Sequence, residues 1–245
     1  MHLSKKQIPV QERLILALDV PSPDEAKRLV ETLGESINFY KLGLQLFMAG
    51  GYFELIEWMR KKGKKVFVDL KFFDVPETVG KAVQQLKTKE VEFVTVHGND
   101  DMLLAAVKHQ NGLKILAVTV LTSLDQNDLK DLGFKCDIPD LVLSRAKRAL
   151  KIGCSGVISS GLEAERLRDT LGDNFLIVTP GIRAFSNSAS RIDDQKRTVD
   201  VEEAFLKGAD YIVVGRPIRE AKNPRKAAEE HQQRIKKLFS SHSKN

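Results

Sequence analysis

The sequence has little cysteine, little tryptophan or tyrosine and no long apolar run. Its 245 residues include two cysteines, which excludes a disulfide framework and a cysteine-based zinc cluster. The longest apolar runs, residues 14–18 and 115–121, have the length of strands and fall far short of the ~18 residues of a membrane helix. Asp19 ends the first run without a small-residue cleavage site, so the segment does not match a signal peptide. We therefore expect a cytoplasmic protein with no membrane segment.

The excess of basic over acidic residues is mild. The chain has 39 lysines and arginines against 33 acidic residues, a formal net charge of +6. Basic and acidic residues are interspersed, and one tryptophan and three tyrosines cannot supply a basic surface interleaved with aromatic rings. The sequence therefore predicts no nucleic-acid partner. An anionic small-molecule substrate accounts for the charge equally well.

Short β-branched runs alternate with amphipathic helical stretches, which predicts parallel βαβ units. Ser22 followed by Pro23 marks the start of a helix, and Gly34 marks its end. No G-x-G-x-x-G motif follows the first strand and no linker divides the chain, so a single (β/α)8 TIM barrel over residues 1–245 fits better than an open doubly wound sheet. Residues 1–12 form an N-terminal extension. The predicted strands span residues 14–18, 39–42, 65–70, 93–97, 114–120, 156–159, 175–179 and 211–215.

Charged residues lie on strand faces that are expected to point into the barrel. In the third strand, alternation places Phe67, Asp69 and Lys71 on one face and apolar residues on the other. Asp19 ends the first strand, and Lys41 lies on the inward face of the second. A solvated charge cluster is the plainer interpretation. We favour an array of alternating sign around one cavity, because barrels carry their chemistry at these strand ends.

The carboxylates on either side of Lys71 indicate its chemical role. Asp69 and Asp74 favour the ammonium form, whereas a Schiff-base lysine must be unprotonated. Lys71 is therefore predicted to donate a proton rather than to form an imine. His97 ends the fourth strand without a second histidine or a carboxylate cluster at metal-ligand spacing, so we expect it to pack against its neighbours.

Two pairs of glycine and arginine follow the last strands. Gly181 and Arg183 follow the seventh strand, and Gly215 and Arg216 follow the eighth. Glycine amides, two guanidinium groups and a helix start at these strands form the usual phosphate grip of a barrel. The long connection over residues 180–198 is rich in small polar residues and is predicted to be a phosphate-binding lid loop.

The segment from Asp69 to Thr78 reads DLKFFDVPET and resembles the signature of the orotidine 5′-phosphate decarboxylase family, D-x-K-x-x-D-[IV]-P-x-T, at every fixed position. Six other blocks resemble the family in the right order: residues 16–19, 41–43, 118–123, 180–183, 194–197 and 214–218. The likeness is greatest to the stand-alone bacterial type. Phe73 departs from the histidine of many relatives, at a position without an assigned role.

The resemblance implies a lyase without cofactor or metal that converts orotidine 5′-phosphate to UMP and CO₂, the last step of de novo UMP synthesis. It implies that Lys71 protonates C6 of the pyrimidine and that Asp69 lies beside the departing carboxylate. It also implies a homodimer in which Asp74 and Thr78 reach the partner's site. The remaining implied contacts are Asp19 and Lys41 at the ribose, Thr122 and Ser123 at the pyrimidine, and Arg183, Gln195, Gly215 and Arg216 at the phosphate.

Two alternative functions stay open. The group of keto-gulonate phosphate decarboxylase and hexulose phosphate synthase shares the D-x-K-x-x-D core, but it resembles a Mg²⁺ enzyme with a glutamate ligand near the end of strand two. Here Lys41 occupies that strand end, where its ammonium would repel a cation. A phosphate- or nucleotide-binding barrel without catalysis would need the phosphate grip but not Asp69, Lys71 and Asp74 together.

Overall fold

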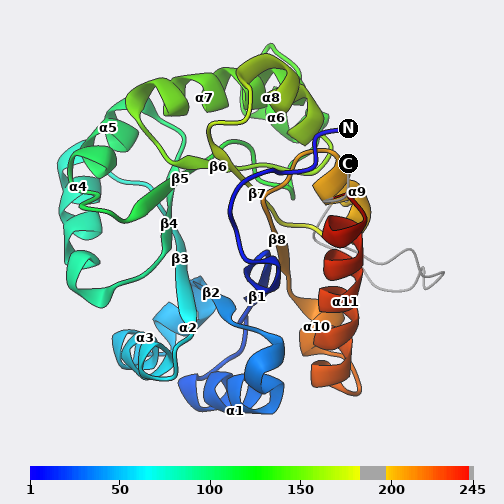
Figure 1. The fold of residues 1–245 in the computed structure, drawn as a ribbon. Coiled ribbons are helices and arrows are strands. Elements are labelled where there is room, and N and C mark those ends of the chain that lie inside the picture. The colour runs from blue at the N-terminus through cyan, green and yellow to red at the C-terminus, as the bar shows by residue number, and fades with distance from the viewer. Residues whose placement is uncertain (183–196, 243–245) are drawn as a thin grey trace.

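The computed structural model describes residues 1–182 and 197–242. Its eight strands are parallel and pair in sequence order, and β8 pairs with β1 to close the barrel (Figure 1). This confirms the predicted TIM barrel. The strands are β1 (Leu14–Ala17), β2 (Phe39–Gly43), β3 (Lys65–Phe72), β4 (Phe93–His97), β5 (Lys114–Val118), β6 (Gly156–Ile158), β7 (Leu176–Thr179) and β8 (Tyr211–Val214).

The helices surround the barrel, and their ends follow the sequence signals. Ser22 accepts a hydrogen bond from the Glu25 nitrogen at 3.2 Å, and Pro76 and Pro224 begin two helices as predicted. The α-helices are α1 (Pro23–Leu33), α2 (Leu44–Met48), α3 (Tyr52–Lys61), α4 (Pro76–Gln85), α5 (Asp100–Lys108), α6 (Gln126–Asp131), α7 (Ile138–Ile152), α8 (Ala164–Leu171), α9 (Val201–Leu206), α10 (Arg216–Arg219) and α11 (Pro224–His242). Short 3-10 helices are η1 (Val10–Glu12), η2 (Gly34–Ser36) and η3 (Lys87–Lys89). No helix within the described ranges is both long and apolar enough to cross a membrane.

Two hydrophobic layers hold the barrel together. The outer layer joins the strands to the helices, and the inner layer fills the barrel itself. Four aromatic rings dominate the inner layer: Phe39, Phe67, Phe93 and Tyr211, with ring centroids 5.1 to 5.9 Å apart. Side chains therefore fill the barrel interior at the level of these rings, as is usual for a closed barrel of this kind.

A buried ion network closes the amino-terminal end of the barrel. Asp210 is fully buried, and its carboxylate contacts Arg168 at 2.8 Å and Lys6 at 3.0 Å. Ser4 donates to the same carboxylate at 2.5 Å. The N-terminal segment therefore lies across this end of the barrel, as Figure 1 shows in blue.

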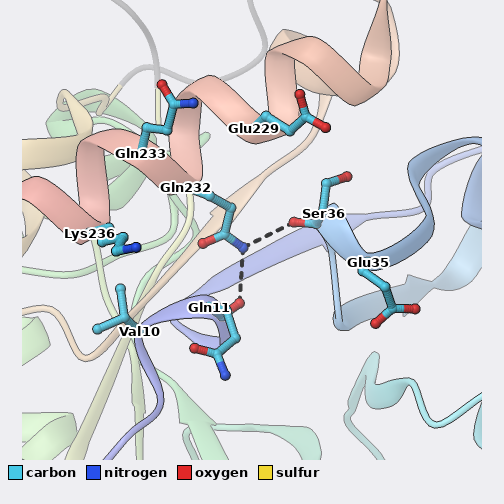
Figure 2. A pocket seen from close by; sticks show the side chains of 8 residues that line it. All are labelled: Val10, Gln11, Glu35, Ser36, Glu229, Gln232, Gln233 and Lys236. Atoms are coloured by element: carbon cyan, nitrogen blue, oxygen red, sulfur yellow. Dashed lines mark hydrogen bonds between the residues drawn. The ribbon is translucent and has the colours of Figure 1, made fainter.

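The last helix joins this end from the other side. Gln232 of α11 donates to the carbonyl oxygens of Gln11 and Ser36, at 3.0 and 3.1 Å (Figure 2). These two acceptors belong to η1 and η2, which precede β1 and β2. Both ends of the chain thus brace the amino-terminal face, and the opposite face carries the loops that can bind a ligand.

Candidate active site

A cavity of about 630 Å³ opens at the carboxyl ends of the strands. Loops and strand ends from both halves of the barrel line it, and its wall combines charged, hydroxyl and apolar groups. The lining residues are Ala17, Asp19, Lys41, Phe67, Asp69, Lys71, Val118, Val120, Leu121, Thr122, Ser123, Ile158, Pro180, Gly181, Val213, Gly215, Arg216 and Arg219. Nine of the residues that the sequence analysis placed in the site therefore share one cavity: Asp19, Lys41, Asp69, Lys71, Thr122, Ser123, Gly181, Gly215 and Arg216.

Four charged groups of alternating sign form a continuous chain in this cavity. Lys71 Nζ lies 3.0 Å from both carboxylate oxygens of Asp69. Lys41 Nζ lies 3.1 Å from Asp69 Oδ2 and 3.5 Å from Asp19 Oδ1. The array that the strand alternation predicted is thus present, with Asp69 in contact with both ammonium groups.

The contacts favour the charged forms of Asp69 and Lys41. Burial alone raises the pKa of the Asp69 carboxyl, but the ammonium groups of Lys41 and Lys71 outweigh burial and lower that pKa to about 2. Burial likewise lowers the pKa of Lys41, and the carboxylates of Asp69 and Asp19 reverse this effect and raise it above its ordinary value. At neutral pH the cavity therefore holds fixed charges of both signs.

A bulge in β3 sets the position of Lys71. After Val68, β3 has two more residues than β4 between successive pairs. Lys71 itself has a φ of +49°, a left-handed backbone that is unfavourable for a residue with a side chain. Strained backbone of this kind gathers at functional sites, and here it lies on the residue that carries the ammonium group.

Thr95 supports the bulge, and the sequence analysis did not identify it. Its hydroxyl donates to Asp69 Oδ1 at 2.9 Å and accepts from the Lys71 backbone nitrogen at 2.9 Å. Thr95 is fully buried. Its signal was present in the sequence, because alternation from the inward-facing Phe93 puts a polar Thr95 on the inner face of β4.

A second group of polar residues lies at the ends of β7 and β8. Gly181 has a φ of +76°, a conformation open to glycine, and Gly215 precedes α10, which begins with Arg216. Amide and guanidinium groups from two adjacent strands can together hold a phosphate. The predicted phosphate ligands Arg183 and Gln195, and most of the predicted lid loop, lie outside the described residues.

Arg219 is a further cation in the cavity that the sequence analysis missed. It lies one helical turn after Arg216, so both side chains reach the same side of α10. Its Nη1 lies 3.5 Å from Asp19 Oδ2, on the side of that carboxylate away from Lys41. The spacing of three residues was the signal that would have identified it.

Asp74 and Thr78 stand apart from the cavity of their own chain. Both are exposed, and the Asp74 carboxylate accepts a hydrogen bond from the Val75 nitrogen at 2.6 Å. Among the described residues no ion pair joins Asp74 to Lys71, so within one chain Lys71 is paired with Asp69 alone. His97 packs its ring against Phe73, with centroids 4.9 Å apart, and does not line the cavity.

Comparisons with known proteins agree with this geometry. Residues 12–231 match the model of the Orotidine 5'-phosphate decarboxylase / HUMPS family. The chain is 59% identical to orotidine 5'-phosphate decarboxylase of Methylococcus capsulatus, over 97% of both chains, and 48% identical to that of Rhodopseudomonas palustris, over 89% of this chain and 92% of the relative. The crystal structure of the Lactobacillus acidophilus enzyme of that name aligns with a TM-score of 0.79 and 33% identity, over 93% of this chain and 99% of the other. The chain therefore belongs to the Orotidine 5'-phosphate decarboxylase / HUMPS family.

Proposed function

We propose that this protein is a cytoplasmic carboxy-lyase that converts orotidine 5′-phosphate to UMP and CO₂ in pyrimidine biosynthesis, without a cofactor. The observation that carries the proposal is the Asp69–Lys71 contact of 3.0 Å in a cavity whose other end offers Gly215 and Arg216 to a phosphate. The relatives reported above are named for the same activity.

The chemical step needs a cation at the carbon that loses its carboxylate. Breaking the bond from C6 to the carboxylate leaves an electron pair on C6, and no carbonyl or imine conjugated with it accepts that pair. Stabilisation must then come from a charge that is already in place. The Lys71 ammonium supplies it and transfers a proton to C6, after which the neutral amine takes up a proton from water.

Asp69 holds that ammonium before the reaction begins, and Lys41 in turn holds Asp69. Asp69 contacts both lysines, and Thr95 donates a further hydrogen bond to the same carboxylate, so these groups hold one another in place. Lys41 and Asp19 line the same cavity and would bind the ribose hydroxyls. Interactions prepared in this way need no rearrangement when charge develops on C6.

Binding energy at the phosphate end serves orientation rather than proton transfer. Arg216 and the amides near Gly215 would grip the phosphate, and Thr122 and Ser123 would contact the pyrimidine on the other side of the cavity. Contacts remote from the reacting carbon can hold it against Lys71, because they restrict the bound substrate to one orientation.

We also propose a homodimer in which each subunit supplies Asp74 and Thr78 to its partner's site. These two residues are exposed and do not line the cavity of their own chain, and the apolar side chains of Phe73 and Val75, which flank Asp74, are 66% and 63% exposed. Exposed apolar residues next to a displaced site residue suit an interface between two copies of the chain.

Mixing two inactive variants tests the shared site. Lys71→Ala and Asp74→Ala homodimers should both be inactive, while subunit exchange should restore about a quarter of the sites, because half of the dimers are mixed and each has one intact site. Light scattering tests the dimer itself. Val75→Glu should give a monomer, whereas Leu132→Glu, which changes another exposed apolar residue, is the matched control and should leave the dimer intact. A mixture that stays inactive while exchange is demonstrated would contradict the shared site.

Turnover itself is followed by the ultraviolet absorbance of the pyrimidine with orotidine 5′-phosphate, with and without EDTA. The proposal predicts loss of the orotate band at the same rate in both samples. No turnover would favour sugar-phosphate chemistry or a binding protein. EDTA-sensitive turnover would show that the interpretation of Lys41 as a group that excludes a metal is wrong.

A further inference from the structure

A buried arginine beside the cavity has no part in the mechanism described above. Arg197 is 8% exposed, and its Nη1 donates to Glu163 Oε1 at 2.7 Å. Its Nη2 donates to the carbonyl oxygens of Val120 and Leu121, at 3.0 and 3.1 Å. One guanidinium group thus joins the loop after β6 to the loop after β5.

The two carbonyl groups belong to the wall of the cavity. Val120 and Leu121 line it, and Thr122 and Ser123 follow them directly. Since a backbone carbonyl is rigidly linked to the next residue, a group that holds these oxygens also sets the direction of the hydroxyl groups that follow. Arg197 therefore acts on the side of the cavity that faces the pyrimidine in the proposed complex.

The segment that carries Arg197 is itself fixed to the end of β7. Val199 forms a parallel bridge with Ile182, and its nitrogen donates to the Gly181 carbonyl at 3.2 Å. On its other side Val199 packs so closely on Gly161 that an added Cβ there would lie 2.5 Å from Val199 Cγ2. The backbone next to Arg197 is thus held in place, so the guanidinium group can fix the loop after β5.

The buried ion pair of Arg197 and Glu163 leaves polar atoms without hydrogen bonds in the part of the chain that the structure describes. Within the described residues, Arg197 Nε and Glu163 Oε2 are buried without a hydrogen-bond partner. Glu163 is the N-cap of α8, yet its side chain makes no cap hydrogen bond and turns to Arg197 instead. Burial raises the pKa of the Glu163 carboxyl, which the nearby guanidinium offsets only in part. A buried ion pair of this kind contributes little to the free energy of folding, so stability does not account for it.

We propose that Arg197, held by Glu163, is a positioning residue for the pyrimidine base: it fixes the Val120 and Leu121 carbonyls and thereby places Thr122 and Ser123. The inference rests on the proposed function and deepens it. The effect of Arg197 is separable from phosphate and ribose binding, because Thr122 and Ser123 follow β5 whereas those contacts come from the ends of β1, β2, β7 and β8. Loss of Arg197 should weaken ligands that carry a base and spare ligands that lack one.

Calorimetric titration of the whole protein with UMP and with ribose 5-phosphate measures this difference. Arg197→Lys keeps the charge but loses the forked contact, so the Kd for UMP should rise about tenfold while the Kd for ribose 5-phosphate changes less than about twofold. Glu163→Gln keeps an acceptor oxygen for the guanidinium and should shift the same ratio about threefold. It serves as the second variant if Arg197→Lys does not fold.

Arg168→Lys is the matched control. Arg168 is another buried arginine paired with a carboxylate, at the opposite end of the barrel, so its substitution should lower stability and leave the ratio of the two Kd values unchanged. Equal weakening of both ligands in the Arg197 and Glu163 variants, or a shifted ratio in the control, would overturn the positioning role. A wild-type protein that binds neither ligand would instead overturn the proposed function, on which the inference depends.

Discussion

The backbone nitrogen of Lys71 donates to the hydroxyl of Thr95 at 2.9 Å, across the bulge between β3 and β4. The same hydroxyl donates to Asp69 Oδ1. A single oxygen thus fixes the backbone of the proposed proton donor and the carboxylate of its partner, because a hydroxyl can donate and accept at once.

Thr95→Val should therefore lower kcat by about tenfold to a hundredfold with a smaller change in KM. Valine has nearly the same shape but leaves the Lys71 backbone nitrogen without its partner and removes one of the two hydrogen bonds to Asp69 Oδ1, so the ammonium loses its fixed position. Thr95→Ser retains the hydroxyl and should keep most of the activity. Steady-state kinetics of both variants measures kcat and KM. Equal losses of kcat in the two variants would show that side-chain packing at position 95, rather than the hydroxyl group, sets the activity.

Lys71→Ala and Arg216→Ala should fail in different ways. The first removes the proton donor, so kcat should fall by at least about a thousandfold while the affinity for UMP stays within about tenfold. The second removes a charged contact to the phosphate, so KM and the Kd for UMP should rise by about tenfold or more. Kinetics combined with titration of UMP separates the two effects. Equal loss of binding in both variants would refute this division of roles.

The Asp69 carboxylate should make stability depend on acid pH. Its pKa of about 2 lies below the unfolded value of 3.8, so the ionised group stabilises the fold above about pH 4, by on the order of 2 kcal/mol, and this contribution is lost as pH falls through 2. Urea unfolding of the wild-type protein and Asp69→Asn should differ most from pH 5 to pH 7 and converge toward pH 2.5. A difference that stays constant over this range would contradict the depressed pKa.

The buried carboxylate at the other end of the barrel should matter for stability and not for turnover. Asp210→Asn leaves Arg168 buried without its counter-charge, so the free energy of unfolding should fall by about 3 kcal/mol or more. Lys6→Ala removes only the contact to the N-terminal segment and should cost about 1 kcal/mol or less. Urea unfolding gives both values, and kcat of the folded fraction should stay unchanged. Equal losses in the two variants would show that the N-terminal segment, rather than Arg168, is the main partner.

Strand periodicity was sufficient to predict most of this molecule. Each of the eight predicted runs contains or overlaps a strand, and alternation within β3 correctly put Asp69 and Lys71 on the face of Phe67. This worked because a closed parallel barrel buries both faces of every strand, so an inward charge is conspicuous. The predicted third strand ended at Leu70, whereas β3 continues to Phe72 through the bulge.

Contacts between distant segments could not be predicted in the same way. The partners of Thr95 depend on a register shift between two strands, and the Arg197–Glu163 pair joins residues 34 positions apart. Asp74 precedes a helix like many solvated residues, and nothing in the sequence pattern shows that its side chain lies outside the cavity of its own chain. The roles proposed for these residues depend on packing, which a linear pattern does not encode.

The left-handed backbone of Lys71 also bears on how this position can change over evolutionary time. An L-residue in that conformation costs the fold about 1 to 2 kcal/mol, and glycine would avoid this cost. Selection for thermal stability alone would therefore favour glycine at position 71. The lysine found there in this chain therefore costs folding free energy, and its reactivity is what that cost supports.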